Sequence, residues 1–539
     1  MRIRESILVF STSSSIIEDS MTTGYTLLRF PEEFYAIFYD PNYERSISLA
    51  DAKRKDQVNY ICRYLRELNC QSILVEYDYV DHDYLDDYAN YYAKCFGEYK
   101  RFCRRAHFWR TDVTNTPFED IIIDQAKAKI DILKRDYLGF VVIKPLPNAV
   151  VGRTVLGTWS DDGGKRKYRA IRDYTANLYG LELSVSSLAF QEQDTVLAAC
   201  ATSALWCAFQ MTSKLFGTCS PTPSEITRCA TQYIQTTRPV PSKGLRVEQI
   251  CYAISENGLA PEVQQINPDT ALNSLIYAYV SAGIPLILGY EIEGTENRHA
   301  VTICGYRLES APKFNHESRD ENVEMNLIGR RISELYVHDD NIGPFSRLIC
   351  DNAGDSQGNS RIFTRTLESR PEIKQICVPE LVIAPVYHKI RIQFNDLLGA
   401  VRKINRYFKA LGIDISTNSH PAGIEWEIRL FDLTSFRQKV IALPTIARDD
   451  KRSLLFSNFA KYAWTASARF SNTRIFSFVA DATDIARSFY FRHFIEHIPG
   501  IRENIASIIR RCDPQLETAS GAGLQSAFVA FLRKEILLL

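Results

Sequence analysis

The chain has 539 residues, 64 acidic and 64 basic side chains, and 45 % hydrophobic residues. This is the composition of an ordinary globular protein, and a chain of this length usually folds into about three domains. Because there is no basic surplus to neutralise phosphates or to bind anionic lipids, the composition argues against a nucleic-acid or membrane partner.

The cysteines and the apolar runs indicate the compartment. Thirteen cysteines are irregularly spaced without any C-x-x-C pair, which argues against a disulfide framework or a structural zinc site. The apolar run at residues 7–10 is too short for a signal peptide, and no uncharged apolar run of 18 residues suggests a membrane span. We therefore expect a cytoplasmic protein that needs no metal and no cofactor.

Residues 1–137 are predicted to form an N-terminal α/β domain of unknown role. Ser6–Phe10 and Ser72–Glu76 are strand candidates, and an amphipathic helix lies between them. The aromatic stripe from Tyr88 to Cys103 has helical spacing, and such a stripe usually belongs to a core or to a domain interface.

An acidic segment precedes that stripe, from Asp78 to Asp87. Clustered carboxylates can hold a hard cation, but this segment lacks the glycine and the spacing of a calcium loop. Negative charge at the start of a helix is stabilised by the helix dipole. We interpret these carboxylates as the opening of a helix and not as a metal site.

A nucleophile candidate lies in the middle region, residues 138–385. The strand Leu181–Leu188 leads towards Cys200, and the apolar residues after Cys200 have the spacing of a buried helical face. Cys200 is therefore expected in the first turn of a helix, where the free amides and the positive dipole end favour a thiolate. Gln193, seven residues upstream, is placed to donate its amide to a developing oxyanion beside the Cys200 backbone N–H.

A base candidate opens a strand a hundred residues later. Two apolar strands, Ile284–Tyr290 and His299–Tyr306, flank a polar loop, and His299 stands at the start of the second strand. The imidazole is the titratable group that works near neutral pH, and a cysteine nucleophile requires such a base. His299 is therefore the predicted base.

An orienting carboxylate is expected after the strand Leu335–His338. Asp339 is predicted to accept the second imidazole N–H of the base, although Asp340 and Asn341 fit the same spacing. His338 and Asp339 are neighbours on a strand and should point to opposite faces, which argues against a metal site that uses both. Residues 314–324 are interpreted as a surface insertion before this strand.

Residues 386–539 are predicted to form a C-terminal α+β domain of unknown role. A helical tract from about Ile485 would carry His493 and His497 four residues apart, a spacing that can bind zinc. Since the H-E-x-x-H pattern is absent, we interpret this pair as a helix surface.

The order Cys200, His299 and Asp339 resembles the papain-like cysteine peptidases, and most closely the bacterial branch that cleaves bacteriocin leader peptides. The resemblance covers residues 138–385 and implies an α+β fold in which the nucleophile helix packs on an antiparallel sheet, flanked here by two α/β or α+β domains. It also implies a nucleophile at Cys200, a base at His299, an orienting residue at Asp339 and an oxyanion donor at Gln193.

The sequence departs from that family in two ways. The C-G-S-C-W signature of papain is replaced by Ala199-Cys200-Ala201-Thr202. Gln193 also stands one residue further from the cysteine than is usual, so Gln191 or Asp194 are alternatives for its place.

These features predict a cysteine peptidase that cleaves a peptide or isopeptide bond in a protein or peptide substrate through an acyl-enzyme. An acyl transferase of the transglutaminase or deamidase type would use the same three residues. A non-catalytic papain-like scaffold is the alternative from another class, in which the outer domains hold a regulatory protein partner.

Overall fold

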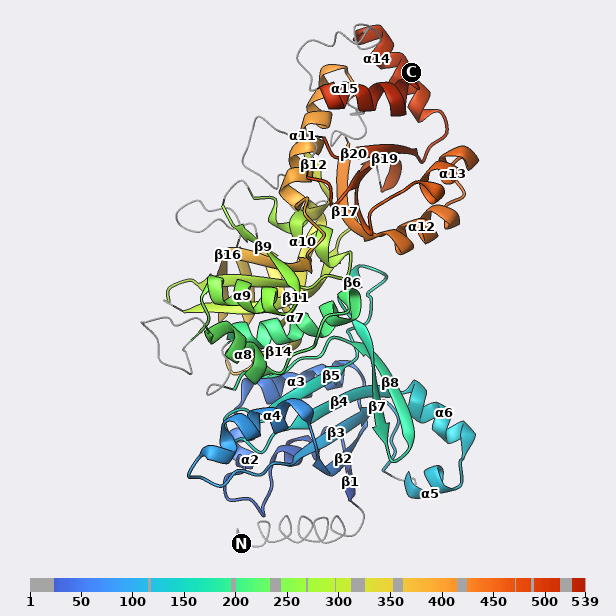
Figure 1. Cartoon of the computed structure of the whole chain (residues 1–539). Coiled ribbons are helices and arrows are strands. Elements are labelled where there is room, and N and C mark those ends of the chain that lie inside the picture. Colours follow the sequence, from blue (N-terminus) through green and yellow to red (C-terminus); the bar gives the residue numbers. More distant parts are fainter. Residues whose placement is uncertain are drawn as a thin grey trace.

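The computed structural model of the chain is elongated, with the N-terminal sheet at one end and the C-terminal domain at the other (Figure 1). The structure describes residues 24–114, 118–194, 200–232, 244–267, 270–295, 297–311, 325–351, 362–413, 424–470, 472–485, 489–513 and 526–538. Helices and antiparallel sheets both contribute strongly, which confirms the predicted α+β class. The predicted strand Ser6–Phe10 and the predicted insertion at 314–324 lie outside the described residues.

The first sheet is an antiparallel meander in which each strand pairs with the next. Its strands are β1 (Tyr25–Arg29), β2 (Ser72–Tyr79), β3 (Cys103–Trp109), β4 (Tyr137–Ile143) and β5 (Val151–Leu156). Helices α2 (Leu49–Ala52), α3 (Asp56–Glu67), α4 (His82–Asn90), α5 (Phe118–Ile123) and α6 (Lys127–Arg135) connect them, with short 3-10 turns η1 (Phe34–Phe38) and η2 (Tyr92–Lys94). The boundary predicted between residues 137 and 138 falls inside this sheet, because β3 pairs with β4.

Both faces of the first sheet are covered. On β2, Ile73 and Val75 belong to the hydrophobic cluster that includes α3, whereas Leu74 belongs to the cluster that includes the central helix α7. Alternate residues of a strand point to opposite faces, so a continuous apolar run is expected where both faces are buried. This explains why β2 is apolar without alternation.

The predicted aromatic helix from Tyr88 to Cys103 is wrong beyond its first turn. Helix α4 ends at Asn90, Tyr91 leaves the helical region with φ −131° and ψ −62°, and Cys103 begins β3. Of this stripe only Cys103 lies in a strand, where β3 pairs with β2 and β4, whereas residues 92–94 form the turn η2 and residues 95–102 lie outside any helix or strand. The tyrosine rings still pack together, as Tyr92 lies 4.7 Å from Tyr99 between ring centres.

The central region is an antiparallel sheet that closes on itself. Its path is β10 (Leu286–Ile292), β11 (Arg298–Leu308), β13 (Ile332–Asp339), β14 (Gly343–Asp351), β15 (Ile362–Thr366) and β16 (Lys374–Tyr387). Because β16 also pairs with β10, these six strands form a barrel. Strand β9 (Leu259–Gln265) adds to β16, β6 (Arg166–Tyr168) adds to β11, and β7 (Arg172–Leu178) with β8 (Leu181–Ser187) forms a separate hairpin.

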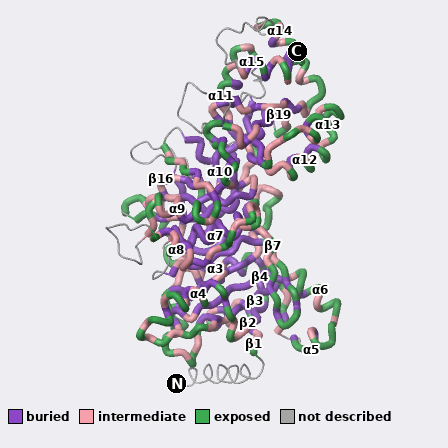
Figure 2. Tube along the Cα trace, viewed as in Figure 1, coloured by how far each residue is buried: buried purple, intermediate pink, exposed green. Residues whose placement is uncertain are grey.

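Helix α7 (Cys200–Phe216) lies between the first sheet and the barrel (Figure 1). One hydrophobic cluster contains Phe140 of β4, Trp206 of α7 and Ile287 of β10, so the first sheet, the helix and the barrel share a core. Figure 2 shows this buried centre along the middle of the molecule. Helices α8 (Pro223–Thr231), α9 (Val247–Glu256) and α10 (Leu272–Val280) pack around it. Within the described ranges, no helix combines the length and the apolar character that a bilayer crossing requires.

The C-terminal region has its own sheet, in the order β12-β17-β18-β19-β20. The bounds are β12 (Asn326–Leu327), β17 (Glu425–Asp432), β18 (Tyr462–Phe470), β19 (Thr473–Asp481) and β20 (Phe491–Glu496). It carries helices α11 (Phe394–Ala410), α12 (Leu433–Ala442), α13 (Arg448–Phe456), α14 (Ile501–Cys512) and α15 (Ser526–Leu532), and a π-turn η5 (Arg533–Leu537). Strand β12 comes from the central region and pairs parallel with β17, which ties the two regions together.

The predicted helical tract with His493 and His497 is wrong. His493 lies in β20, paired with Val479, and His497 follows the strand. The side chain of His497 lies 2.8 Å from the Ser477 hydroxyl, a hydrogen-bond distance. Because His493 pairs in a strand, the spacing of four residues does not place the two histidines on one face of a helix.

A buried carboxyl joins the barrel to the C-terminal region and makes stability depend on pH. Glu262 of β9 accepts a hydrogen bond of 2.6 Å from the Tyr279 hydroxyl, and the Phe394 backbone N–H at the start of α11 also donates to it. Burial raises the pKa of Glu262 to about 7. A carboxyl whose pKa is raised on folding adds stability at pH values below its pKa in the unfolded chain. This contribution is lost as the pH rises through about 7, the pKa in the folded protein.

We therefore expect Glu262→Gln, which mimics the protonated acid, to gain stability relative to the wild type by about 3 kcal/mol between pH 4.5 and pH 8. Urea unfolding at several pH values measures the difference, with the exposed Glu372→Gln as the control. A difference between Glu262→Gln and wild type that stays constant with pH would contradict the assignment.

Candidate active site

The nucleophile candidate stands at the start of α7. Cys200 is the first residue of the helix and is half-buried, whereas the following three turns are buried. The Thr302 hydroxyl of β11 donates a 2.7 Å hydrogen bond to the Ala204 carbonyl of α7. This contact fixes the helix against the strand that carries the base candidate.

The base candidate, His299, is the second residue of β11 and is 6 % exposed. Its Nε2 lies 2.8 Å from Oδ1 of Asp339, the last residue of β13. The structure therefore brings these two predicted residues into contact across the sheet.

Cys200 lies near His299, since its thiol is one of the groups that act on the imidazole. Burial disfavours the charged ring, but Asp339, Asp340 and the Cys200 thiol together raise the pKa of His299 well above its usual value. These neighbours favour the imidazolium form of His299.

Asp339 is completely buried and is held by more than the histidine. Arg365 donates from Nη1 to Asp339 Oδ2 at 2.5 Å and to the Tyr290 hydroxyl at 2.8 Å, and Tyr290 donates to the same carboxylate oxygen at 3.3 Å. Burial alone would raise the pKa of Asp339, but Arg365 and His299 hold it far below its usual value. The carboxylate therefore stays ionised next to the imidazole.

Sequence reasoning missed Arg365 and Tyr290. Tyr290 lies directly opposite His299 in the β10–β11 register, so pairing these two predicted strands would have identified it. Arg365 enters from β15, which contributes to this site only because the barrel closes. Its one sequence signal is an arginine within a short apolar strand.

The two alternatives for the orienting residue lie near the ring but contact it less closely. Asp340 Oδ1 is 3.4 Å from His299 Nε2, and Asn341 Nδ2 is 3.3 Å from the same nitrogen. Burial raises the pKa of Asp340 to about 6. Asp339 therefore has the shortest contact and the more acidic carboxyl.

The group His299, Asp339 and Asp340 has ligand atoms within 4.8 Å of one another, and among the described residues it is the one such group of metal-ligand type. Arg365 already supplies a positive charge to Asp339, and the raised pKa of Asp340 limits the negative charge offered to an ion. These contacts fit a hydrogen-bonded triad better than a cation site.

His338 faces away from the triad, as the alternation of β13 predicts. Its Nε2–H donates to the Leu188 carbonyl at 2.9 Å, and its Nδ1 accepts from the Phe345 backbone N–H at 3.1 Å. Burial lowers the pKa of His338 to about 4, so the ring is neutral. It is a structural residue that joins β13 to the end of β8.

The segment before Cys200 is held by the N-terminal region. Glu192 is paired with Lys55 and accepts from the Val151 backbone N–H at 3.2 Å, and Asp194 accepts from the Tyr92 hydroxyl. Residues 195–199, which link this segment to the helix, lie outside the described residues. The first domain therefore contributes to the position of the nucleophile.

The oxyanion candidates differ in what they contact. Gln193 is half-buried and its side chain makes no hydrogen bond to any residue that the structure describes. By contrast, the Asp194 carboxylate is engaged by Tyr92, and the Gln191 backbone is engaged by the Cys207 thiol. The Asp194 side chain is therefore already engaged, and the side-chain amide of Gln193 has no partner among the residues that the structure describes.

The hydrogen bond from Tyr92 gives a testable consequence. We expect Tyr92→Phe to lower the free energy of unfolding by about 1.5–3 kcal/mol, the usual value of a hydrogen bond to a charged group. Because the segment before Cys200 loses a tether, alkylation of Cys200 should also slow several-fold. Urea unfolding and mass spectrometry measure the two effects, with the exposed Tyr39→Phe as control. Wild-type values for both would contradict this role.

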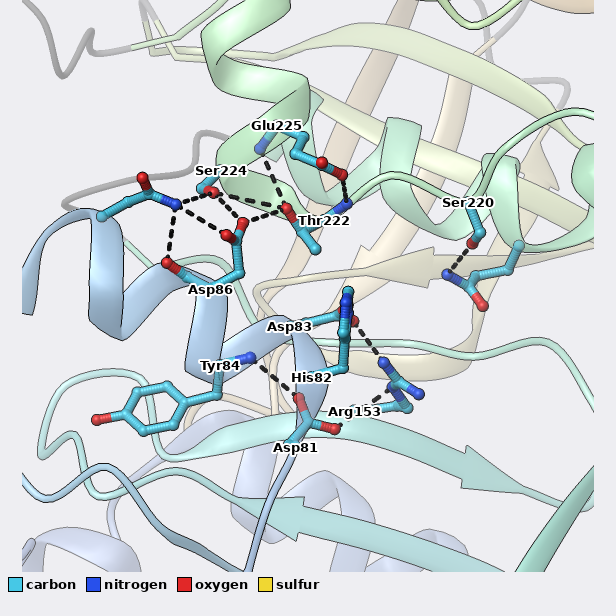
Figure 3. Close-up of polar contacts among 12 residues, drawn as sticks. Asp81, His82, Asp83, Tyr84, Asp86, Arg153, Ser220, Thr222, Ser224 and Glu225 are labelled. Atoms are coloured by element: carbon cyan, nitrogen blue, oxygen red, sulfur yellow. Dashed lines mark hydrogen bonds and ion pairs between the residues drawn. The ribbon is translucent and has the colours of Figure 1, made fainter.

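The acidic segment before the first-domain tyrosines makes structural contacts (Figure 3). Asp81 caps the start of α4, Arg153 of β5 pairs with Asp83 at 2.8 Å, and Asp86 accepts a 2.6 Å hydrogen bond from Thr222 at the start of α8. As predicted, these carboxylates open a helix. They also join α4 to α8 and so connect the first domain to the central one.

Comparison with known proteins gives no further guide to this site. No family model matches the chain, and no curated protein matches it significantly. The chemistry of the site is therefore inferred from its residues and their geometry.

Proposed function

We propose that the chain is a cysteine hydrolase with a papain-like central domain, which cleaves a peptide or isopeptide bond by a Cys–His–Asp mechanism. The observation that carries the proposal is the hydrogen bond between His299 and Asp339 at 2.8 Å, next to Cys200 at the start of α7, whose thiol acts on the imidazole. A helix that carries the cysteine, packed on a closed antiparallel sheet that carries the other two residues, supports the fold assignment.

In the proposed reaction Cys200 gives its thiol proton to His299, and the sulfur then attacks the substrate carbonyl and forms a tetrahedral adduct. The amide of Gln193 and the Cys200 backbone N–H stabilise the negative oxygen. His299 then gives its proton to the leaving amine, which leaves an acyl-enzyme on Cys200. A water that loses its proton to His299 releases the acid and restores the thiol.

The surroundings are consistent with a thiol enzyme. All thirteen cysteines lie in the described residues and none is disulfide-bonded. A nucleophilic thiol needs a reducing setting, so we include a cytoplasmic location in the proposal.

The test is incubation of the purified chain with a library of peptides, followed by mass spectrometry for new termini. The proposal expects cleavage that disappears in Cys200→Ala. Adding a primary amine separates hydrolysis from acyl transfer, because a transferase would join the amine to the acyl group. A binding scaffold would be favoured if the chain shows no cleavage and no amine incorporation, and if Cys200 reacts no faster than the other cysteines.

A further inference from the structure

Helix α12 lies in the C-terminal domain near its border with the central region (Figure 1), and cationic side chains gather beside it. Arg429 of β17 and Lys439 of α12 both lie over the Phe431 ring, at 4.9 Å and 4.6 Å from its centre. Arg169, just after β6, is exposed and acts on the same lysine. We call Arg169, Arg429, Lys439 and Phe431 the junction cluster.

The carboxylates near the junction cluster are already engaged. Glu427 lies 2.7 Å from Arg469 and 2.9 Å from Arg474, and it accepts a 2.6 Å hydrogen bond from the Tyr277 hydroxyl. Its oxygen is 3.6 Å from Arg429, which is therefore the most distant of its three arginines. Glu427 therefore neutralises the positive charge of Arg429 only in part.

Asp432 is the other carboxylate at this junction. Its Oδ1 accepts the Ser435 backbone N–H at 2.9 Å, which caps α12. Neither Arg169 nor Lys439 forms an ion pair with any residue that the structure describes. Two exposed cations therefore stand beside Arg429 with little opposing charge.

The electrostatics of Lys439 reflect this excess. Partial burial, together with the positive charges of Arg429, Arg169 and Arg474, lowers the pKa of Lys439 to about 8, and Asp432 opposes the shift. Like charges held together in this way repel one another, and a bound anion would relieve the repulsion. Arg429 is also fixed in place, since its Nε donates to the Ser281 hydroxyl at 3.1 Å.

We propose that the junction cluster binds the phosphate group of a phosphate monoester. Three cations from separate parts of the chain, two of them arginines with planar forks of donors, match the charge and the several oxygens of a dianion. Arg169 belongs to the central region and the other two cations to the C-terminal domain, so a bound phosphate would bridge both. This site is independent of the proposed hydrolase activity.

Orthophosphate is the probe, used with the full-length chain. The first measurement is calorimetric titration at constant ionic strength, where we expect saturable binding by wild type and by Cys200→Ala alike. Arg169→Gln and Lys439→Gln should each weaken binding about tenfold, the effect of losing one charge-assisted hydrogen bond. The exposed Arg370→Gln, outside the cluster, should bind like wild type.

The second measurement reports on the lysine itself. Acetylation of Lys439 by acetic anhydride at pH 8 should slow several-fold when phosphate is added, because the bound anion favours the ammonium form, whereas the exposed Lys403 should be unaffected. The absence of saturable phosphate binding, or equal acetylation rates with and without phosphate, would overturn the proposal. Binding of a single-stranded oligonucleotide without any effect of orthophosphate would overturn the monoester assignment.

Discussion

Cys200→Ala is expected to abolish peptide cleavage, and His299→Ala to lower kcat/KM by about 10²–10⁴, the usual contribution of general acid–base catalysis. Asp339→Asn should cost about 10²-fold or more, because the amide cannot stabilise the imidazolium as a carboxylate does. The physical reason is that His299 forms a 2.8 Å hydrogen bond with Asp339 and lies near the Cys200 thiol, which acts on its imidazole. Peptide cleavage rates of the purified variants measure the effect.

The control for this series is Cys219→Ala, since Cys219 is exposed and lies beyond the end of α7. It should keep wild-type cleavage. Because residues that act as a unit give non-additive losses, the double variant of Cys200 and His299 should be no worse than Cys200→Ala alone. Substantial cleavage by Cys200→Ala would contradict the assignment of the nucleophile.

Arg365→Met should destabilise the fold by about 3–5 kcal/mol, the cost of removing one partner of a buried ion pair. Arg365 is 3 % exposed and Asp339 is fully buried, so the variant leaves a carboxylate in the barrel without its guanidinium. The same change should raise the pKa of Asp339 and so weaken the support of His299. Urea unfolding measures the loss of stability, and peptide cleavage rates measure how far the effect of Asp339 on His299 is weakened.

Two variants separate this effect from a general loss of packing. Arg298→Met removes an exposed arginine that pairs with Glu380 at 2.9 Å, and it should change stability by less than about 1 kcal/mol. Combining Arg365→Met with Asp339→Asn should recover part of the stability, since the Asp339 carboxylate is then no longer buried without its guanidinium, but not the activity. If Arg365→Met unfolds like wild type, Arg365 has no positioning role.

Local patterns in the sequence predicted the elements of the site well. The spacing after Cys200 gave the helix, the apolar run at 284–290 and the run that His299 opens gave two strands, and the turn residues placed Asp339 at the end of a third. These signals lie within single elements, where periodicity reports directly on the buried face. The contact between His299 and Asp339 was expected from the order of the residues and from the resemblance to papain-like peptidases.

The remaining features depend on pairing between distant strands, which the spacing of residues does not encode. The barrel closes because β16 pairs with β10, and only that closure brings Arg365 behind Asp339. Strand β4 joined the first sheet for the same reason, although the sequence assigned it to the middle region.

Helical spacing misled where tertiary pairing was stronger. The residues before Cys103 have aromatic side chains at helical intervals, and His493 and His497 are four apart, yet Cys103 and His493 lie in strands. Aromatic residues also favour strands, so pairing decided both cases.

The most direct test is the rate at which iodoacetamide alkylates Cys200 across pH 5–9 in native protein, read by mass spectrometry for each cysteine. We predict that Cys200 is alkylated fastest of the thirteen cysteines at pH 6. His299→Ala should slow alkylation of Cys200, while the other cysteines keep their rates. Equal rates at Cys200 in wild type and His299→Ala, with both proteins folded, would contradict this prediction.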